Sequence, residues 1–159
     1  MSDAVVRLAV PSDEEGLMQH VHMLHGENGL FPLSEAKARS IIGRALNRQG
    51  IIIGVIGDAD LEASICLCLD QPYYSDAFQL TELWNFVAPP RPKRAGHAKK
   101  MIEFAKMCSD RMAIPLTVGV LSNERVEAKQ RLYERQLEPA GVFFVHNGRL
   151  AGPTAWNNR

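Results

Sequence analysis

Hydrophobic and polar positions along the chain follow two periods, one typical of β-strands and one typical of α-helices. Runs rich in apolar and β-branched residues predict six strands, at residues 4–10, 50–57, 61–69, 79–88, 114–121 and 142–146. Between them, apolar residues recur at every third or fourth position, as on the buried side of a helix, and predict helices beginning near residues 12, 34, 95 and 122. The expected order is therefore β-α-α-β-β-β-α-β-α-β.

Capping residues support three of these helices. Ser12 followed by Glu15 has the pattern of a capping box, and Ser34 can cap the second helix through about residue 48. Ser122 and Asn123 can cap the last helix through about residue 136. The positions expected to face the core in the second and third helices are Ala38, Ile41, Ile42, Ala45, Ala98, Met101, Ile102, Ala105 and Cys108.

The order of elements restricts the sheet. The short turn at residues 58–60 requires an antiparallel pair, whereas a strand–helix–strand crossover requires a parallel one. We therefore expect an α/β (α+β) fold in one domain at residues 1–147, with a mixed, mostly antiparallel sheet flanked by helices. Residues 148–159 have no firm pattern and are assigned to a C-terminal tail.

Composition excludes several classes of protein. Hydrophobic residues make up 46% of the 159 residues, and the 18 basic and 18 acidic side chains cancel, so no global field steers the chain to nucleic acid. Three cysteines without a CxxC pair indicate buried thiols, and the histidines at 20, 22 and 25 lack helical ligand spacing, so no metal is expected. No signal peptide or membrane span is expected, which favours a cytoplasmic protein.

The third helix begins beside a cluster of positive charge. A Pro-rich turn follows the strand at 79–88, and the cationic residues around the helix start are Arg91, Lys93, Arg94, Lys99 and Lys100. Cations and unpaired backbone N–H groups at a helix N-terminus make an anion site, and a phosphate-bearing ligand is the simplest guest. A solvated face is the plainer alternative, and contact with nucleic-acid phosphates is a third.

Two segments of this chain resemble signatures of the GNAT superfamily of acyl-CoA N-acyltransferases. The loop Lys93-Arg94-Ala95-Gly96-His97-Ala98 resembles the Gln/Arg-x-x-Gly-x-Gly/Ala signature, with Lys93 at the Gln/Arg position. Arg131-Leu132-Tyr133-Glu134-Arg135 resembles the Leu-Tyr-Glu-Lys/Arg element. The expected order of strands and helices is also the GNAT order. The resemblance implies acetyl-CoA as co-substrate, with its pyrophosphate in the basic loop.

The resemblance also implies roles for individual residues. Tyr133 would be the general acid for the departing thiolate, although a structural tyrosine is the alternative. Glu82 would be the general base, since it precedes Gly96 by the distance of the catalytic glutamate in histone-modifying members; a structural ion pair is the alternative. By strict alternation, Glu82 shares a face of its strand with large apolar side chains, Leu80, Trp84 and Phe86.

Further residues are expected to bind the co-substrate or the acceptor. The co-substrate set comprises the backbone of Phe86, Val87 and Ala88, the basic loop with Arg91, Lys93, Arg94, Ala95, Gly96, His97 and Ala98, and Asn123. Asn123 is explained equally well as a helix cap. Glu27, Asn28 and Phe31 are candidates for acceptor contact. The pair Tyr73-Tyr74 could line a cleft for a cation, but packing on the sheet is the more ordinary interpretation.

We therefore expect an N-acetyltransferase that moves an acetyl group from acetyl-CoA to a primary amine by direct attack in a ternary complex. The amine would belong to a small molecule or a peptide, and the resemblance favours a homodimer. A non-catalytic acyl-CoA-binding or regulatory protein of the same fold is the main alternative. A nucleic-acid-binding module is a third class, and neither nucleic acid nor a membrane is the expected partner.

Overall fold

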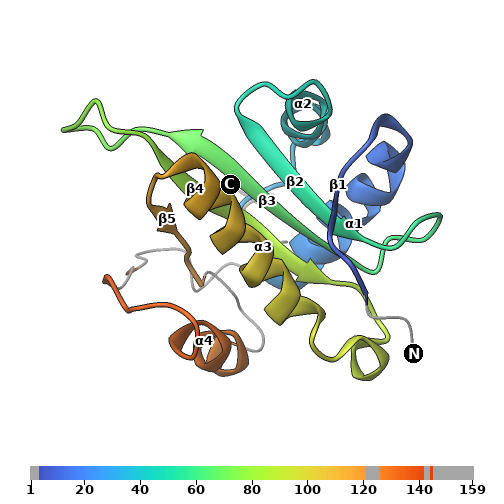
Figure 1. Cartoon of the computed structure of the whole chain (residues 1–159). Helices are drawn as coiled ribbons and strands as arrows, with labels where there is room; N and C mark the ends of the chain where they lie inside the picture. Colours follow the sequence, from blue (N-terminus) through green and yellow to red (C-terminus); the bar gives the residue numbers. More distant parts are fainter. Residues whose placement is uncertain (1–3, 121–125, 142–143, 145–159) are drawn as a thin grey trace.

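The computed structural model describes residues 4–120, 126–141 and 144 (Figure 1). Its strands are β1 (Arg7–Leu8), β2 (Ile51–Ile56), β3 (Ala63–Asp70), β4 (Gln79–Val87) and β5 (Leu116–Thr117). Its α-helices are α1 (Glu14–Asn28), α2 (Glu35–Leu46), α3 (His97–Met112) and α4 (Val126–Glu134). Short 3-10 helices at Pro11–Asp13 and Arg91–Arg94 precede α1 and α3.

The five strands form one mixed sheet in the order β1-β2-β3-β4-β5. The first four are antiparallel, and β4 and β5, which α3 connects, are parallel. This arrangement confirms the expected fold class and order up to α4. Apart from residue 144, the strand expected at 142–146 lies outside the described residues, as does the tail from 148. The homodimer that the resemblance favours stays a prediction.

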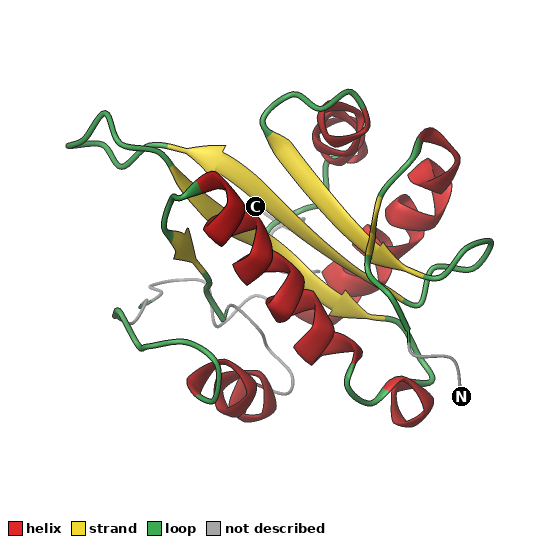
Figure 2. Cartoon of the chain, in the orientation of Figure 1, coloured by secondary structure: helices red, strands yellow, loops and turns green. Residues whose placement is uncertain are grey.

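Helices cover both faces of the sheet (Figures 1 and 2). On one face, α1 and α2 pack on the side chains of every second residue of β2, and the side chains of the residues between them point to the other face. On the other face, α3 and Tyr133 of α4 pack on Ile65, Leu67 and Leu80. Gly54 allows α3 to approach closely, because a Cβ atom there would lie 2.6 Å from the Phe104 ring. Two apolar layers therefore fix the sheet from both sides.

A β-bulge in β4 overturns the expected side-chain alternation. Leu67 pairs with Glu82 and Cys66 with Trp84, so Leu83 is the extra residue. Leu80 and Glu82 consequently face the layer of α3 and α4, whereas Trp84 faces the α1 and α2 layer. The prediction that every second residue from Leu80 to Phe86 lies on the same face was wrong. An inserted residue breaks the strict alternation on which that prediction depended.

The start of the first helix also differs from the expected capping box. The side chain of Asp13, rather than Ser12, accepts a hydrogen bond from the Val10 N–H at 2.8 Å. The same carboxylate accepts two hydrogen bonds from Arg7, at 2.7 and 2.9 Å, and Arg7 lowers the pKa of Asp13. The capping bond is therefore made by Asp13, three residues after Val10, and its carboxylate is also paired with Arg7. At the second helix, Ser34 caps the backbone N–H of Lys37 as expected.

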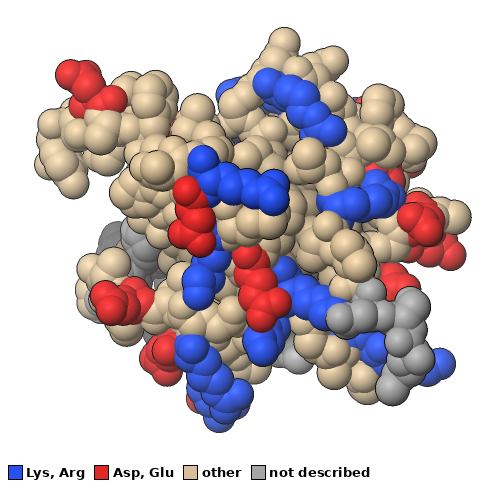
Figure 3. All heavy atoms as spheres, in the orientation of Figure 1, with Lys and Arg blue, Asp and Glu red and all other residues tan. Residues whose placement is uncertain are grey.

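Charged side chains of both signs are mixed on the face that carries α3 (Figure 3). This agrees with the balanced total of 18 basic and 18 acidic residues. None of the helices in the described part of the chain is long and apolar enough to cross a membrane.

Candidate active site

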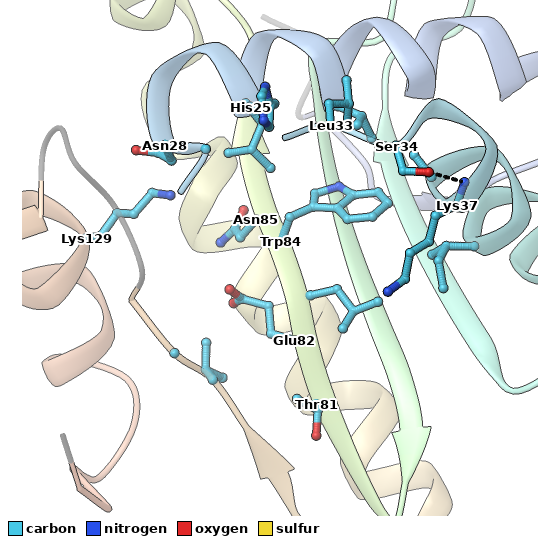
Figure 4. Close-up of a pocket in the computed structure, with 18 of the residues that line it drawn as sticks. His25, Asn28, Leu33, Ser34, Lys37, Thr81, Glu82, Trp84, Asn85 and Lys129 are labelled. Atoms are coloured by element: carbon cyan, nitrogen blue, oxygen red, sulfur yellow. Dashed lines mark hydrogen bonds between the residues drawn. The ribbon is translucent and has the colours of Figure 1, made fainter. Parts of the chain in front are cut away.

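Strands β4 and β5 diverge after a short parallel contact. Among the described residues, they pair at Leu80 with Leu116 and at Thr81 with Thr117 alone. A pocket of about 630 Å³ opens where they separate, between the residues after Thr81, the residues after Thr117, and the neighbouring parts of α1 and α2. Figure 4 shows side chains from both strands and both helices directed into this opening. We call it the large pocket.

Glu82 lines the large pocket and is hydrogen-bonded to Tyr133 behind it. The Tyr133 hydroxyl donates a hydrogen bond of 2.9 Å to Glu82 Oε2, which brings together residues 51 apart in the sequence. Burial raises the pKa of Glu82 to about 7, although the Tyr133 hydrogen bond and the charge of Lys129 act in the opposite direction. Burial and the neighbouring carboxylate raise the pKa of Tyr133, so its hydroxyl stays protonated. The pair thus combines a carboxylate that titrates near neutrality with a protonated phenol.

A second, smaller pocket of about 120 Å³ adjoins the large one. The residues that line both are Asn28, Asn85 and Lys129. Phe86, Val87, Arg91, Ala98 and Leu132 are among the other residues that line the small pocket. The two pockets therefore meet at the three shared residues, with Lys129 of α4 along one side; Glu82 lines only the large pocket, and Tyr133 lines neither.

Asn85 lies at this junction with an unused acceptor. Its amide group donates a long hydrogen bond of 3.5 Å to the Ala98 carbonyl. Its Oδ1 is buried and has no hydrogen-bond partner among the described residues. A buried carbonyl oxygen without a partner costs free energy, which a ligand N–H could recover. Sequence reasoning missed Asn85, because strict alternation drew attention to its neighbours on the other side of β4.

The basic segment is largely engaged in contacts within the chain. Arg91 forms an ion pair with Glu27 of α1 and donates to the Val87 carbonyl at 3.2 Å. Arg94 donates to the carbonyls of Ala88 and Pro89, at 2.8 and 2.9 Å. The backbone of residues 87 and 88, expected to contact the co-substrate, therefore already accepts hydrogen bonds from these arginines.

The remaining residues of the basic loop surround the start of α3. Lys93, Ala95 and Gly96 are exposed, and His97 is buried with its Nε2 donating to Glu62 at 2.7 Å. Gly96 has a φ of 92°, which a glycine adopts without strain, and a Cβ atom there would meet no atom within 4 Å. The space over this turn is open, as an anion approaching the first N–H groups of α3 requires. Asn123 lies outside the described residues.

Of the candidates for acceptor contact, two lie at the pockets. Asn28 lines both pockets. Glu27 lines the small pocket and forms an ion pair with Arg91, which also lines it. The Phe31 carbonyl accepts a hydrogen bond of 2.7 Å from His25, while its side chain is exposed. Tyr73 and Tyr74 are 99% and 78% exposed and contact each other edge to face, so they do not pack on the sheet, and they line neither of the two pockets.

The three histidines of α1 have separate partners. His20 is buried, His22 Nε2 lies 2.8 Å from Glu35 Oε1, and His25 donates to the Phe31 carbonyl. In the described ranges, no group of three or more His, Cys, Asp or Glu side chains could hold a metal ion. Their different partners explain why the cluster in the sequence does not become a cluster in space.

Sequence reasoning also missed a buried network behind Trp84. The indole N–H of Trp84 donates to Ser64 Oγ at 3.0 Å, and His20 Nδ1 lies 2.9 Å from the same oxygen. His20 Nε2 donates to the Leu61 carbonyl at 2.9 Å, so Nδ1 accepts the Ser64 hydroxyl proton. Burial lowers the pKa of His20, in agreement with a neutral ring. Because these residues come from three separate elements, no local motif marks the network.

Comparison with known proteins extends this description. No family model and no curated protein matches the chain. Among solved structures, AAC(6')-Iy in complex with the bisubstrate analog CoA-S-monomethyl-acetylneamine is similar over 92% of this chain and 98% of its own, with a TM-score of 0.71 and 12% identity. A ribosomal-protein-alanine N-acetyltransferase from Brucella melitensis biovar Abortus 2308 matches with a TM-score of 0.68 and 12% identity, over 92% of this chain and 100% of its own.

A third similar structure contains acetyl-CoA. It is described as a predicted acetyltransferase from Clostridium acetobutylicum and has a TM-score of 0.67 and 13% identity, over 91% of this chain and 96% of its own. The structural neighbours are thus GNAT acetyltransferases, and this chain has the GNAT fold. The resemblance found in the sequence is confirmed at the level of the fold.

Proposed function

We propose that this protein is an N-acetyltransferase that moves an acetyl group from acetyl-CoA to a primary amine within a ternary complex. The observation that carries the proposal is the hydrogen bond between Tyr133 and Glu82, a carboxylate in the wall of the large pocket, which a smaller pocket adjoins. Two adjoining pockets suit two substrates, and the pair supplies a proton acceptor and a proton donor where they meet. The similarity to acetyltransferase structures supports the same activity.

The residues around the small pocket suit acetyl-CoA. The pocket continues along β4 to Arg91 and Ala98, close to the open turn at Gly96. Lys93 is exposed beside this turn and adds positive charge for phosphates. The unpartnered Asn85 Oδ1 could accept an amide N–H from the pantetheine arm. The co-substrate would supply an acyl thioester, which an amine attacks.

Glu82 would act as the base. An alkylammonium group has a pKa of about 10 and must lose a proton before it attacks. A carboxylate whose pKa is raised to about 7 is ionised in half of the molecules at that pH and accepts a proton more readily than an ordinary glutamate. Lys129, which also lines the large pocket, lowers the pKa of Glu82 and so favours its ionised form.

Tyr133 would act as the acid. Its pKa is raised by burial and by the Glu82 charge, so the hydroxyl keeps its proton across the neutral range. That proton can pass to the departing sulfur. A protonated Glu82, having accepted the amine proton, can then return a proton to the phenolate oxygen along the 2.9 Å hydrogen bond. The pair would restore itself after each transfer without a covalent intermediate.

Titration calorimetry with acetyl-CoA and with dephospho-CoA tests the co-substrate site. We expect binding of acetyl-CoA, weaker binding of dephospho-CoA, and a loss of affinity in Lys93→Ala. Lys106→Ala, on the exposed side of α3, is the matched control and should bind like the wild type. Lys93 is the cleaner target than Arg94, because Arg94 also holds two carbonyl groups of the preceding turn.

Turnover separates the enzyme from the non-catalytic alternative. If acetyl-CoA binds, a panel of primary amines should contain at least one acetylated compound. Binding of acetyl-CoA without transfer to any amine would favour the acyl-CoA-binding or regulatory protein. Absence of acetyl-CoA binding would remove both, and salt-sensitive retention on DNA or RNA would then support the nucleic-acid alternative.

A further inference from the structure

The large pocket holds an uneven set of charges. Its lining is mostly apolar and includes the Trp84 ring. Among the described residues that line it, Glu82 is the single carboxylate, whereas Lys37 and Lys129 are cations. The nearby carboxylates of Glu27 and Glu35 do not line it and are paired, with Arg91 and His22 respectively. A bound acceptor therefore meets one negative and two positive side chains.

Lys37 differs from Lys129 in its surroundings. Lys129 acts on Glu82, as its effect on that carboxyl group shows. Lys37 has no carboxylate partner in the described part of the chain; its backbone N–H donates to the Ser34 hydroxyl. It also lies in the first turn of α2, where the helix dipole disfavours a cation. An anion beside Lys37 would interact favourably with both its ammonium group and this end of the helix.

Glu82 and Lys37 lie on either side of strand β4, and the Trp84 ring lies above both in the view of Figure 4. Glu82 is directed toward α4, and Lys37 projects from α2 on the other side of β4. The bulge at Leu83 turns the Trp84 ring away from the face that carries Glu82, and both side chains line the pocket. A ligand that contacts both charges would therefore lie in a pocket whose apolar lining includes Leu83 and Trp84.

We propose that the acceptor is a primary amine with a flat apolar body and a carboxylate at its far end, the amine lying at Glu82 and the carboxylate at Lys37. The inference rests on the proposed function and names its substrate class. Polycationic acceptors are disfavoured, because an additional ammonium group at the far end would meet Lys37 without a second carboxylate among the described lining residues. The apolar lining supplies the remaining affinity by burial of the ligand body.

Three amines with the same ring and the same reacting group test the far-end charge. They are para-(aminomethyl)benzoate, para-methylbenzylamine and para-xylylenediamine, whose far ends are anionic, neutral and cationic. We expect kcat/KM to fall in that order, by about threefold to fivefold at each step for a partly exposed charge pair. The differences should shrink in high salt, which screens exposed charges.

Substitutions at Lys37 test whether this side chain causes the preference for an anionic far end. Lys37→Met should bring the anionic and neutral amines to similar kcat/KM, and Lys37→Glu should reverse the order. Arg44→Glu is the matched control: it makes the same charge change two turns along α2, at an exposed position that does not line the pocket. The control should keep the wild-type order.

Competition titrations that give Kd for the three amines separate this inference from the proposed function. Transfer to all three at equal kcat/KM would overturn the inference and leave the enzyme intact. Acetyl-CoA binding without transfer to any of them or to a wider amine panel would overturn the enzyme, and the order of the Kd values would then decide the charge preference. Failure of all three to bind, or an unchanged order in Lys37→Glu, would overturn the inference.

Discussion

Strand β4 carries a buried polar network on each of its faces, and the two networks differ in how completely their polar groups are paired. On the face of α1 and α2, Trp84, Ser64 and His20 form a chain of hydrogen bonds that ends at the Leu61 carbonyl. On the other face, Tyr133 donates to Glu82, and Asn85 Oδ1 has no partner among the described residues. The Leu83 bulge separates them.

The difference indicates different roles. In the Trp84 network each donor has an acceptor, so it contributes rigidity and holds the indole ring in the wall of the large pocket. In the Glu82 network, a carboxyl group titrates near pH 7 and a buried acceptor remains open. A network with unused capacity is costly to the fold but can exchange protons and bind a ligand. We therefore assign support to the first network and chemistry to the second.

The largest effect that would test this comparison is on catalysis. Glu82→Gln and Tyr133→Phe should each lower kcat by roughly 10²-fold to 10⁴-fold, the usual contribution of general acid–base groups. Acetyl-CoA affinity should change little, since the proposed phosphate site is elsewhere. Steady-state kinetics and calorimetry on the same preparations measure both. Retention of wild-type kcat in both variants would contradict the assignment of chemistry to this network.

The Trp84 network should respond in the opposite way. Ser64→Ala removes the oxygen that accepts from Trp84 and the hydroxyl that donates to His20, which leaves two buried polar groups unpaired. We expect it to lower the free energy of unfolding by about 3 kcal/mol, as two such groups would. Urea unfolding measures this loss. Ser40→Ala, at an exposed position of α2, is the matched control and should change stability by less than about 0.5 kcal/mol.

The kcat of the same variant, Ser64→Ala, tests whether the two networks are independent of each other. Under conditions where it is folded, Ser64→Ala should keep kcat within about threefold of the wild type, because its oxygen touches neither Glu82 nor Tyr133. A fall in kcat as large as that of Tyr133→Phe would show that the two networks are coupled across β4.

The smallest effect concerns stability and pH. The pKa of Glu82 is raised to about 7 in the folded protein, so between about pH 5 and pH 7 the folded state holds a proton that the unfolded state has released. The free energy of unfolding should therefore fall as the pH rises through this window and level off above about pH 8. For this partly buried group we expect a change on the order of 1 kcal/mol.

Comparison of the wild type with Glu82→Gln isolates the contribution of the Glu82 carboxyl group to the free energy of unfolding, since other titrating groups contribute equally to both proteins. The stability difference should shift in favour of Glu82→Gln as the pH rises. A difference that stays constant from pH 5 to pH 8 would mean that the carboxyl group titrates normally in the folded protein.

Much of the architecture was predictable because it depends on neighbouring residues. The period of the apolar residues placed Ile42 and Ala45 on the buried side of α2 and Met101 and Ile102 on the buried side of α3. The turn near residue 58 required the antiparallel pair of β2 and β3. The signature at Gly96 also describes local geometry, a positive φ before a helix. Such features need no information about distant parts of the chain.

The remaining features needed the tertiary structure, because their partners are far apart in the sequence. The chain by itself determined the strand and helix order, the glycine turn before α3, and Glu82 and Tyr133 as candidates. Only the tertiary structure placed these two at 2.9 Å, shifted Trp84 to the other face by a bulge, and left Asn85 between two pockets. The physical reason is that periodicity is set by adjacent residues, whereas bulges and buried hydrogen bonds are decided by what packs against them.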